Sequence, residues 1–470
     1  MPKIILQDTT DHHRIGFEFN RGAVAVGLCT IDALRRLIPG AEFVTFIQLS
    51  DSFAAQHGIK VVKNKLFSSR AFSLSESLKS WWLFLRCALW ATLHKGFHID
   101  AGLLTNNRRL KEYYEAAVVI DLSMDHYNDE SGIIKVLEIS REILLGRLLG
   151  KPVLIYAQSV GPFKGRLASS IARFTLNRAS LITVRENISK GFLDKMAINK
   201  PPICVTADPA FLLEPADDER IAEILRELDL DSSQPLIGIG TPEGELLGGA
   251  RTWRGYKNIL RGIYRMLDYC LPERLLLWPM RLVRGSGYYA TLQSEHSGSI
   301  EASIARIADH LVEALGTSVL IVPHFVPPRG RGSGEENGLV VAERIHQLTS
   351  NKDKIIPVVG DYTPQEIKGI VGQCDLFISM KMHPTIAAIS QCVPTIAIGS
   401  HQKFGGIMQT LGQERWVYDR IPEDIIAKID DAWIHRKEIR KELESRRGAV
   451  RERALFNAQL VKRLLDSVPE

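Results

Sequence analysis

Short apolar segments of strand length alternate with helical segments along most of this 470-residue chain. Regular alternation of strands and helices is typical of a parallel sheet covered by helices on both faces. The predicted fold class is therefore α/β. In the first half the pattern predicts strands at residues 3–7, 41–46, 115–123, 152–157 and 181–184, a strand with a turn at 204–211, and helices at 24–37 and 166–177.

The alternation breaks between residues 213 and 235, where the sequence is polar, and then restarts. A chain of this length exceeds one ordinary hydrophobic core. We therefore expect two Rossmann-like domains, at 1–213 and 214–470, with a charged C-terminal helix from Asp430 onward packing back across both. The strands predicted after the break are at residues 236–240, 275–278, 318–322, 354–359, 375–379 and 395–398.

Composition narrows the class of protein. A hydrophobic content of 45% and a charged content of 24% are typical of a soluble globular protein. The net charge of +5 suits anionic substrates or a weak preference for a membrane surface, and it does not indicate nucleic acid as a partner. The six cysteines have no paired spacing, so we expect no metal site, no disulfide framework and a reducing cytoplasm. The first eight residues are expected to form a strand, not a secretory signal.

Residues 81–93 form the most apolar segment, with three tryptophans between Lys79 and Lys95. The segment is shorter than the roughly 20 residues that span a membrane. Aromatic side chains with flanking lysines are typical of an interfacial helix. A helix buried between layers has a similar composition, so both interpretations remain open.

Residues 374–403 predict a strand, a helix and a second strand in one βαβ step. In open parallel sheets the ligand lies beyond the carboxyl ends of the strands. A helix start near Thr385 would add partial positive charge there. This arrangement predicts a site for a small anion with phosphate or carboxylate groups, although a histidine at a helix start can also be a cap or a surface residue. The polar residues that follow the two strands are Ser379, Lys381, His383, Ser400, His401 and Lys403.

Three further loops carry polar residues. Asp121, Asp125 and Asp129 follow a buried strand, and they fit either a sugar-binding loop or a solvated acidic loop. The glycine-rich segments at 244–255 and 327–334 contain arginines, and they fit either mobile flaps over an anion or surface loops.

Seven short markers occur along the chain. They are NRGA at 20–23, AQSVGP at 157–162, TVRE at 183–186, ADPA at 207–210, PH at 323–324, SMKMH at 379–383 and HQK at 401–403. No single marker is specific, but their order and spacing together are. By these markers the chain resembles the polysaccharide pyruvyl transferase family, whose members are built like GT-B glycosyltransferases, from two Rossmann-like domains that face a cleft.

The resemblance implies transfer of a pyruvyl group from phosphoenolpyruvate to two hydroxyls of one sugar, giving a cyclic ketal and phosphate. It implies that Arg185 holds the donor anion, that His383 is the acid/base residue and that Lys403 contacts phosphate or carboxylate. The scheme needs neither a metal nor a cofactor. Further substrate-binding residues are predicted at Asn20, Arg21, Gly22, Gln158, Ser159, His324, Ser379, Lys381 and His401.

The expected partners are phosphoenolpyruvate and a glycan acceptor, with the oligomeric state open. The acceptor could be an exopolysaccharide repeat on a lipid carrier, a cell-wall polymer or a free glycan. The expected location is the cytoplasm, with peripheral contact at the inner face of the membrane left open.

The sequence departs from the family pattern at two positions. Lys381 stands where the family commonly has arginine, and this replacement weakens bidentate binding of an anion. DLSMD at 121–125 stands where members often have a glycine-rich turn, which indicates a changed donor or acceptor pocket.

Two alternatives to pyruvyl transfer remain. A GT-B nucleotide-sugar glycosyltransferase would bind a nucleoside diphosphate, whereas a pyruvyl transferase would bind phosphoenolpyruvate. A non-catalytic carbohydrate-binding or scaffold protein would keep its role after His383→Ala.

Overall fold

The computed structural model describes residues 1–8, 17–47, 49–62, 74–97, 107–230, 234–242, 297–326, 337–399 and 402–467. The chain forms two compact units. The first contains Met1–Pro215, His401–Arg415 and Lys441–Glu470, and the second contains Ala216–Ser400 and Trp416–Arg440. The predicted strand at 275–278, the loops at 244–255 and 327–334, Ser400 and His401 lie outside the described residues.

The first unit is built on a sheet of seven described strands in the order β3-β2-β1-β4-β5-β6-β7, and every pairing among them is parallel. From β1 the strand order runs through β2 and β3 to one edge of the sheet, and from β4 it runs through β5, β6 and β7 to the other edge. The pair β1 and β4 is therefore the topological switch point of the sheet. Gln7 and Asp121 end these two strands and are aligned in register. The strands are β1 (Lys3–Gln7), β2 (Glu42–Thr45), β3 (Ile59–Val61), β4 (Val118–Asp121), β5 (Val153–Gln158), β6 (Leu181–Val184) and β7 (Ile203–Val205).

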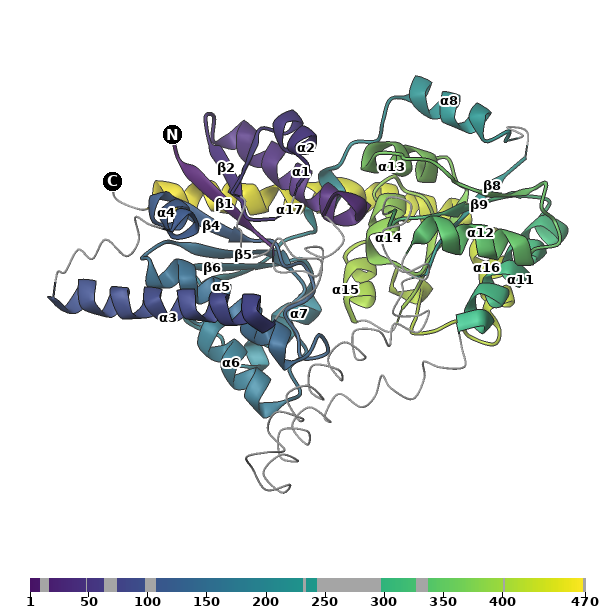
Figure 1. The fold of residues 1–470 in the computed structure, drawn as a ribbon. Coiled ribbons are helices and arrows are strands. Elements are labelled where there is room, and N and C mark those ends of the chain that lie inside the picture. The colour runs from purple at the N-terminus through teal and green to yellow at the C-terminus, as the bar shows by residue number, and fades with distance from the viewer. Residues whose placement is uncertain are drawn as a thin grey trace, which may run out of the picture. The chain divides into compact units, whose positions relative to one another are not determined.

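Helices cover both faces of this sheet (Figure 1). The apolar cluster on one face is contributed by α3 (Leu74–Phe97), α4 (Arg108–Glu115), α5 (Ile133–Leu148) and α6 (Arg166–Leu176). The cluster on the other face includes α1 (Arg21–Leu37) and the end of α17 (Arg436–Asp466). The smaller helices of this unit are α2 (Asp51–Gln56), α7 (Asn187–Lys195) and α15 (Gln402–Thr410).

The second unit repeats this plan with the order β10-β9-β8-β11-β12-β13, again with parallel pairings only among the described strands. Its switch point lies between β8 and β11. The strands are β8 (Leu236–Gly240), β9 (Ser318–Val322), β10 (Ile355–Pro357), β11 (Leu376–Ser379), β12 (Thr395–Ile398) and β13 (Val417–Tyr418).

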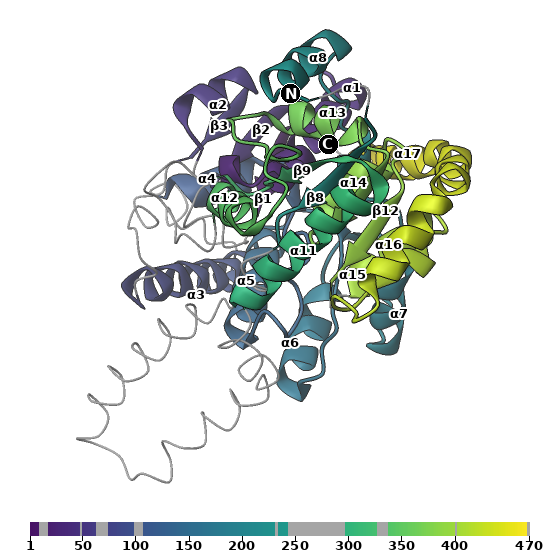
Figure 2. The same cartoon turned by 90° about the vertical axis from the view of Figure 1, so that its right-hand side faces the viewer.

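The helices of the second unit pack in two groups. The helices α11 (Ser297–Leu315) and α12 (Gly338–Leu348) contact each other and strands β9 and β10 (Figure 2). The helix α13 (Pro364–Gly372) contacts both α8 (Asp218–Glu227) and α14 (Met382–Ile389). The last helix of this unit is α16 (Ile425–Ile434).

The structure confirms the predicted α/β class and the two parallel-sheet units. Strands β6, β8, β9 and β12 have the predicted bounds. Strands β3 and β13 were not predicted, because three and two residues are too few to show a periodic pattern. Residues 401–415 were assigned to the second domain, whereas they group with the first unit, where Gly406 lies against Glu186.

Two adjacent glycines of α15 give a matched test of this packing. A Cβ at position 406 would lie 2.8 Å from Cγ of Glu186, which is buried and caps α7. A Cβ at position 405 would meet no atom within 4 Å. We expect Gly406→Ala to lower the free energy of unfolding in urea by about 1–3 kcal/mol. Gly405→Ala should raise it by roughly 0.5–1 kcal/mol, because alanine favours the helix. Equal effects would contradict the contact between α15 and α7.

Candidate active site

Polar residues gather at the carboxyl edge of the second sheet, around its switch point. Strands β9, β8 and β11 are neighbours there, and the chain continues from them into His324, Thr241 and Lys381 respectively. The Thr241 amide donates to the Val322 carbonyl at 3.0 Å, which holds the first two loops together. The rings of His324 and His383 lie nearly parallel, at 11°, with their centroids 6.2 Å apart. The structure therefore brings both predicted histidines to one place.

The turn from β11 into α14 is fixed by hydrogen bonds to one carbonyl. The Lys381 carbonyl accepts from the Ser379 hydroxyl at 2.7 Å and from the Thr385 hydroxyl at 2.8 Å. Lys381 is the N-cap residue, and its side chain makes no capping hydrogen bond. His383 is half-buried in the first turn of α14. The partial positive charge of the helix N-terminus therefore lies at the same turn as Lys381 and His383.

Thr241 is a residue of this edge that the sequence analysis missed. It is fully buried, and its hydroxyl has no hydrogen-bond partner among the described residues. A buried hydroxyl without a partner is unfavourable, so its position at the switch point makes it a candidate ligand group. The sequence signal that could have identified Thr241 is its position directly after the predicted strand 236–240.

Arg185 lies in the first unit, directly after β6, and is 1% exposed. Its Nε donates to the Ser159 hydroxyl at 2.8 Å, and its Nη1 donates to an Asp208 carboxylate oxygen at 2.6 Å. Nη2 is buried and has no hydrogen-bond partner in the described part of the chain. Two of the three guanidinium nitrogens are thus held by neighbouring side chains of the first unit. The site prediction omitted Asp208, although the ADPA marker at 207–210 contains it.

Lys403 lies in the first turn of α15, which also belongs to the first unit. α15 contacts α7, whose N-cap Glu186 directly follows Arg185. The fold therefore places the helix of Lys403 next to the segment of Arg185. The predicted roles of both residues in binding an anion stay predictions.

The other predicted binding residues of the first unit have structural partners. The Asn20 side chain caps α1 by accepting from the amides of Gly22 and Ala23, at 3.0 and 3.1 Å. Arg21 is buried and donates to the Glu18 carbonyl at 3.4 Å. The Gln158 side-chain amide donates to the Asp121 carbonyl at 2.8 Å. These contacts shape the carboxyl edge of the sheet, and roles in binding substrate stay predictions.

Asp121 occupies the switch point of the first sheet. The sequence left a solvated acidic loop as one interpretation of this region, but the Asp121 side chain is fully buried. One carboxylate oxygen accepts from the amide and the hydroxyl of Ser123, at 3.1 and 2.5 Å. Burial raises the pKa of the Asp121 carboxyl to about 7, and the charge of Asp8 acts in the same direction. The hydrogen bonds from Ser123 lower this pKa but do not offset the burial.

Asp121 predicts a pH dependence of stability. Its pKa is raised on folding from the ordinary 3.8 to about 7, so the native state holds the proton more tightly than the unfolded state does. The stability this provides is complete below pH 3.8 and is lost as the pH rises through 7, by about 1.4 kcal/mol per pH unit. We expect Asp121→Asn to remove this decline in urea unfolding at pH 5 and pH 8. Asp353→Asn, which changes an exposed carboxylate, should leave the wild-type pH dependence intact. A decline that persists in Asp121→Asn would contradict the assignment.

No cluster of three or more His, Cys, Asp or Glu side chains suited to a metal ion lies within the described residues. Among the described helices, none combines the length and the apolar character needed to cross a membrane.

Two units with the same Rossmann-type strand order and polar residues at their switch points define a protein of GT-B-like fold. The chain is similar to Anabaena Alr3699/HepE in complex with UDP and glucose, at 12% identity and a TM-score of 0.54 over 100% of both chains. It is similar to S. aureus MnaA in its UDP co-structure, at 10% identity and a TM-score of 0.56 over 100% of this chain and 99% of the other. It is also similar to UDP-GlcNAc 2-epimerase from Neisseria meningitidis bound to UDP-GlcNAc, at 10% identity and a TM-score of 0.56 over 100% of both chains. At these identities the likeness shows the fold.

The family follows from the sequence. A family profile described as polysaccharide pyruvyl transferase matches residues 20–402, so the chain belongs to the polysaccharide pyruvyl transferase family. The resemblance inferred from the seven markers is thereby confirmed. The amylovoran biosynthesis protein AmsJ of Erwinia amylovora is 23% identical over 317 residues, which are 67% of this chain and 65% of AmsJ. The chain thus spans just under two thirds of the length of that relative.

Proposed function

We propose that this protein transfers the pyruvyl group of phosphoenolpyruvate to two hydroxyls of one sugar in a cell-surface glycan, forming a cyclic ketal and releasing phosphate. The observation that carries the proposal is the position of His383. It lies in the first turn of α14, beside Lys381 and with its ring parallel to that of His324, at the switch point of the second sheet. Family membership and the similarity to an amylovoran biosynthesis protein support it.

The reaction needs one group that both donates and accepts a proton near neutral pH, and histidine suits this task. A proton added to the methylene carbon C3 of phosphoenolpyruvate leaves C2 electron-poor, and a sugar hydroxyl forms the first C–O bond there. The C2–O bond to phosphate then breaks, and phosphate departs with the electron pair. The second hydroxyl closes the ketal. One hydroxyl proton replaces the proton given to C3, and the other leaves with phosphate, so His383 ends in its starting state.

Fixed positive charge is needed to hold the carboxylate and the phosphate of the donor. Lys381 and the N-terminus of α14 supply it in the second unit. Lysine acts as a point charge without a forked geometry. In the proposed scheme Arg185 and Lys403 of the first unit also bind a donor anion, and the scheme includes neither a metal nor a nucleotide.

Ligand binding tests the proposal without knowledge of the acceptor. A ligand that binds only the native state raises the thermal midpoint. We expect phosphoenolpyruvate to raise it and UDP and GDP to leave it unchanged. A shift with a nucleotide alone would contradict pyruvyl transfer. Release of phosphate from phosphoenolpyruvate in the presence of candidate glycans would then identify the acceptor.

One observation favours a second candidate function, a nucleotide-sugar glycosyltransferase. Solved structures with this fold include complexes with UDP, and cationic groups at a switch point suit a diphosphate equally well. The nucleotide arm of the thermal experiment decides between the two. A non-catalytic carbohydrate-binding protein would show neither phosphate release nor sugar transfer.

We also propose a cytoplasmic location, with the acceptor on a lipid carrier, in a cell-wall polymer or free. The five cysteines among the described residues are free thiols, in keeping with a reducing compartment. A reporter fused to the chain and assayed in cytoplasmic and extracytoplasmic fractions tests this placement.

A further inference from the structure

The outer side of α3 is apolar and exposed. Trp82, Leu85 and Leu89 are 64%, 56% and 59% exposed, and their spacing puts them on one face of the helix. The opposite face is buried in the core of the first unit, where Leu83, Trp90 and their neighbours contact the layer below. The interpretation of residues 81–93 as a buried helix therefore holds for one face only, and the interfacial interpretation stays a prediction. Large apolar side chains are seldom exposed in such a row without a function.

The neighbouring helix α6 continues this exposed surface. It packs with α3 and α5 on the same face of the sheet, and it exposes Leu167 and Phe174 away from that sheet. Every exposed charged side chain described on α3 or α6, or at the two ends of α6, is basic. These residues are Lys79, Arg86, Lys164, Arg166, Arg173 and Arg178.

The acidic residues close to this surface already have partners. Glu138 pairs with Lys135 at 3.4 Å, and Glu142 is buried and pairs with Arg141 at 2.9 Å. Asp129 accepts from the amides of Lys164 and Gly165, at 2.5 and 2.7 Å, and the exposed Glu130 pairs with the Lys164 ammonium at 3.8 Å. The surface therefore combines exposed apolar side chains with an excess of positive charge.

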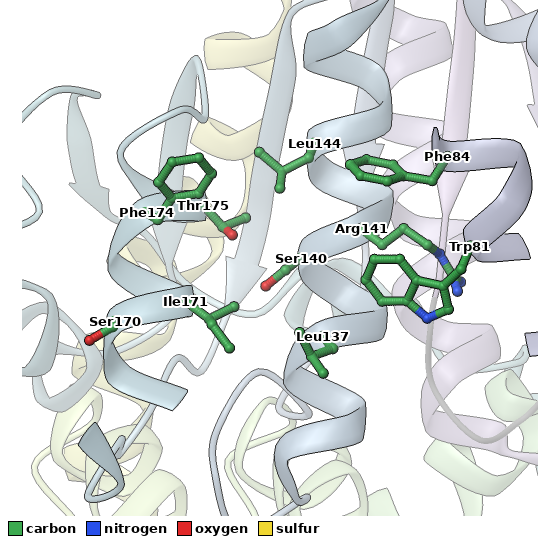
Figure 3. Close-up of a pocket in the computed structure, with 10 residues that line it drawn as sticks. All are labelled: Trp81, Phe84, Leu137, Ser140, Arg141, Leu144, Ser170, Ile171, Phe174 and Thr175. Carbon is green, nitrogen blue, oxygen red and sulfur yellow. The ribbon is translucent and has the colours of Figure 1, made fainter. Parts of the chain in front are cut away.

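An apolar groove of about 260 Å³ runs between α3 and α6 above α5 (Figure 3). The ring of Trp81 lies under the Arg141 guanidinium, whose Cζ is 5.4 Å from the ring centroid. The groove extends the apolar area from the exposed row of α3 to Phe174 on α6. Its apolar lining comes from Trp81, Phe84, Leu137, Leu144, Ile171 and Phe174.

We propose that this face of the first unit, formed by α3, α5 and α6, docks on an anionic lipid surface. Tryptophan and leucine side chains enter the headgroup region, while arginines and lysines beside them contact negatively charged headgroups. A second copy of the chain fits this face less well. A two-fold symmetric contact would place the same basic residues opposite one another, and like charges repel. The positive charge of this face therefore favours an anionic lipid surface over a second copy of the chain. The proposal does not depend on which reaction the protein catalyses.

Vesicle flotation of the full chain tests the proposal. We expect it to float with vesicles of phosphatidylcholine mixed equally with phosphatidylglycerol, to float weakly with phosphatidylcholine alone, and to lose binding in high salt. The double variant Trp82→Ser/Leu89→Ser should weaken partitioning by at least about tenfold. Arg166→Ser/Arg173→Ser should weaken it by about fivefold for each arginine removed, on the anionic vesicles only.

Matched controls lie on the second unit. Leu348→Ser on α12 and Arg226→Ser on α8 change residues of the same types that are equally exposed, and both should float like the wild type. Unchanged thermal midpoints establish that the variants fold. Three results would overturn the proposal: no flotation of the wild type, unchanged flotation of Trp82→Ser/Leu89→Ser, or a wild-type dimer in sedimentation that this double variant dissociates.

Discussion

His383→Ala is expected to lower the rate of phosphate release from phosphoenolpyruvate by roughly 10²–10⁴-fold at saturating substrates. This is the usual contribution of a positioned acid/base group to the rate. The loss follows from the scheme, because no other group is assigned to protonate C3 and to recover a proton from the sugar. His383 is half-buried in the first turn of α14, so its truncation leaves the strands around it in place. Phosphoenolpyruvate should still raise the thermal midpoint of the variant, since the cationic groups remain.

The matched control is His435→Ala. His435 also lies in the second unit, and it is exposed, with its Nδ1 3.0 Å from a carboxylate oxygen of Asp431. Its removal should leave phosphate release unchanged. His324→Ala should lower the rate less than His383→Ala, because His324 lies beside the proposed acid/base residue without replacing it. Wild-type turnover in His383→Ala would exclude its catalytic role.

The buried strands were predictable because both faces of a parallel sheet are covered. Such strands are continuous apolar runs, and the run at 395–398 gave the bounds of β12 directly. The edge at which their carboxyl ends meet follows from the alternation alone. That rule placed the turn of Lys381 and His383 at this edge of the second sheet, and the structure adds His324 from the neighbouring loop.

The partners of buried polar groups were not predictable. Asp208 follows β7 and pairs with Arg185, which follows β6, yet nothing in local sequence couples two carboxyl-edge loops. Asp121 has the same sequence environment as a solvated aspartate, and only its position between β1 and β5 buries it. For α3, composition identified an apolar segment but not which of its faces the sheet would cover. In each case the missing information is which segments distant in sequence pack together.

Arg185→Ala is expected to lower the free energy of unfolding by about 3–5 kcal/mol, because it leaves a buried carboxylate without its partner. Arg185 and Asp208 are 1% and 0% exposed, and their closest atoms are 2.6 Å apart. Asp208 retains one hydrogen bond, from the Ala210 amide at 2.9 Å, which is too little to offset an unpaired buried charge. Urea unfolding of wild type and variant measures the difference.

The double variant Arg185→Ala/Asp208→Asn separates this structural role from the proposed role in binding. Asparagine keeps the oxygen that accepts from Ala210 and removes the charge, so most of the lost stability should return. Binding should not return, because the guanidinium is still missing: phosphoenolpyruvate should fail to raise the thermal midpoint of either variant. A normal shift in the stable double variant would mean that Arg185 only holds Asp208. The donor anion would then depend on Lys403 and the cationic groups around α14, and Lys381→Ala would be expected to weaken the shift.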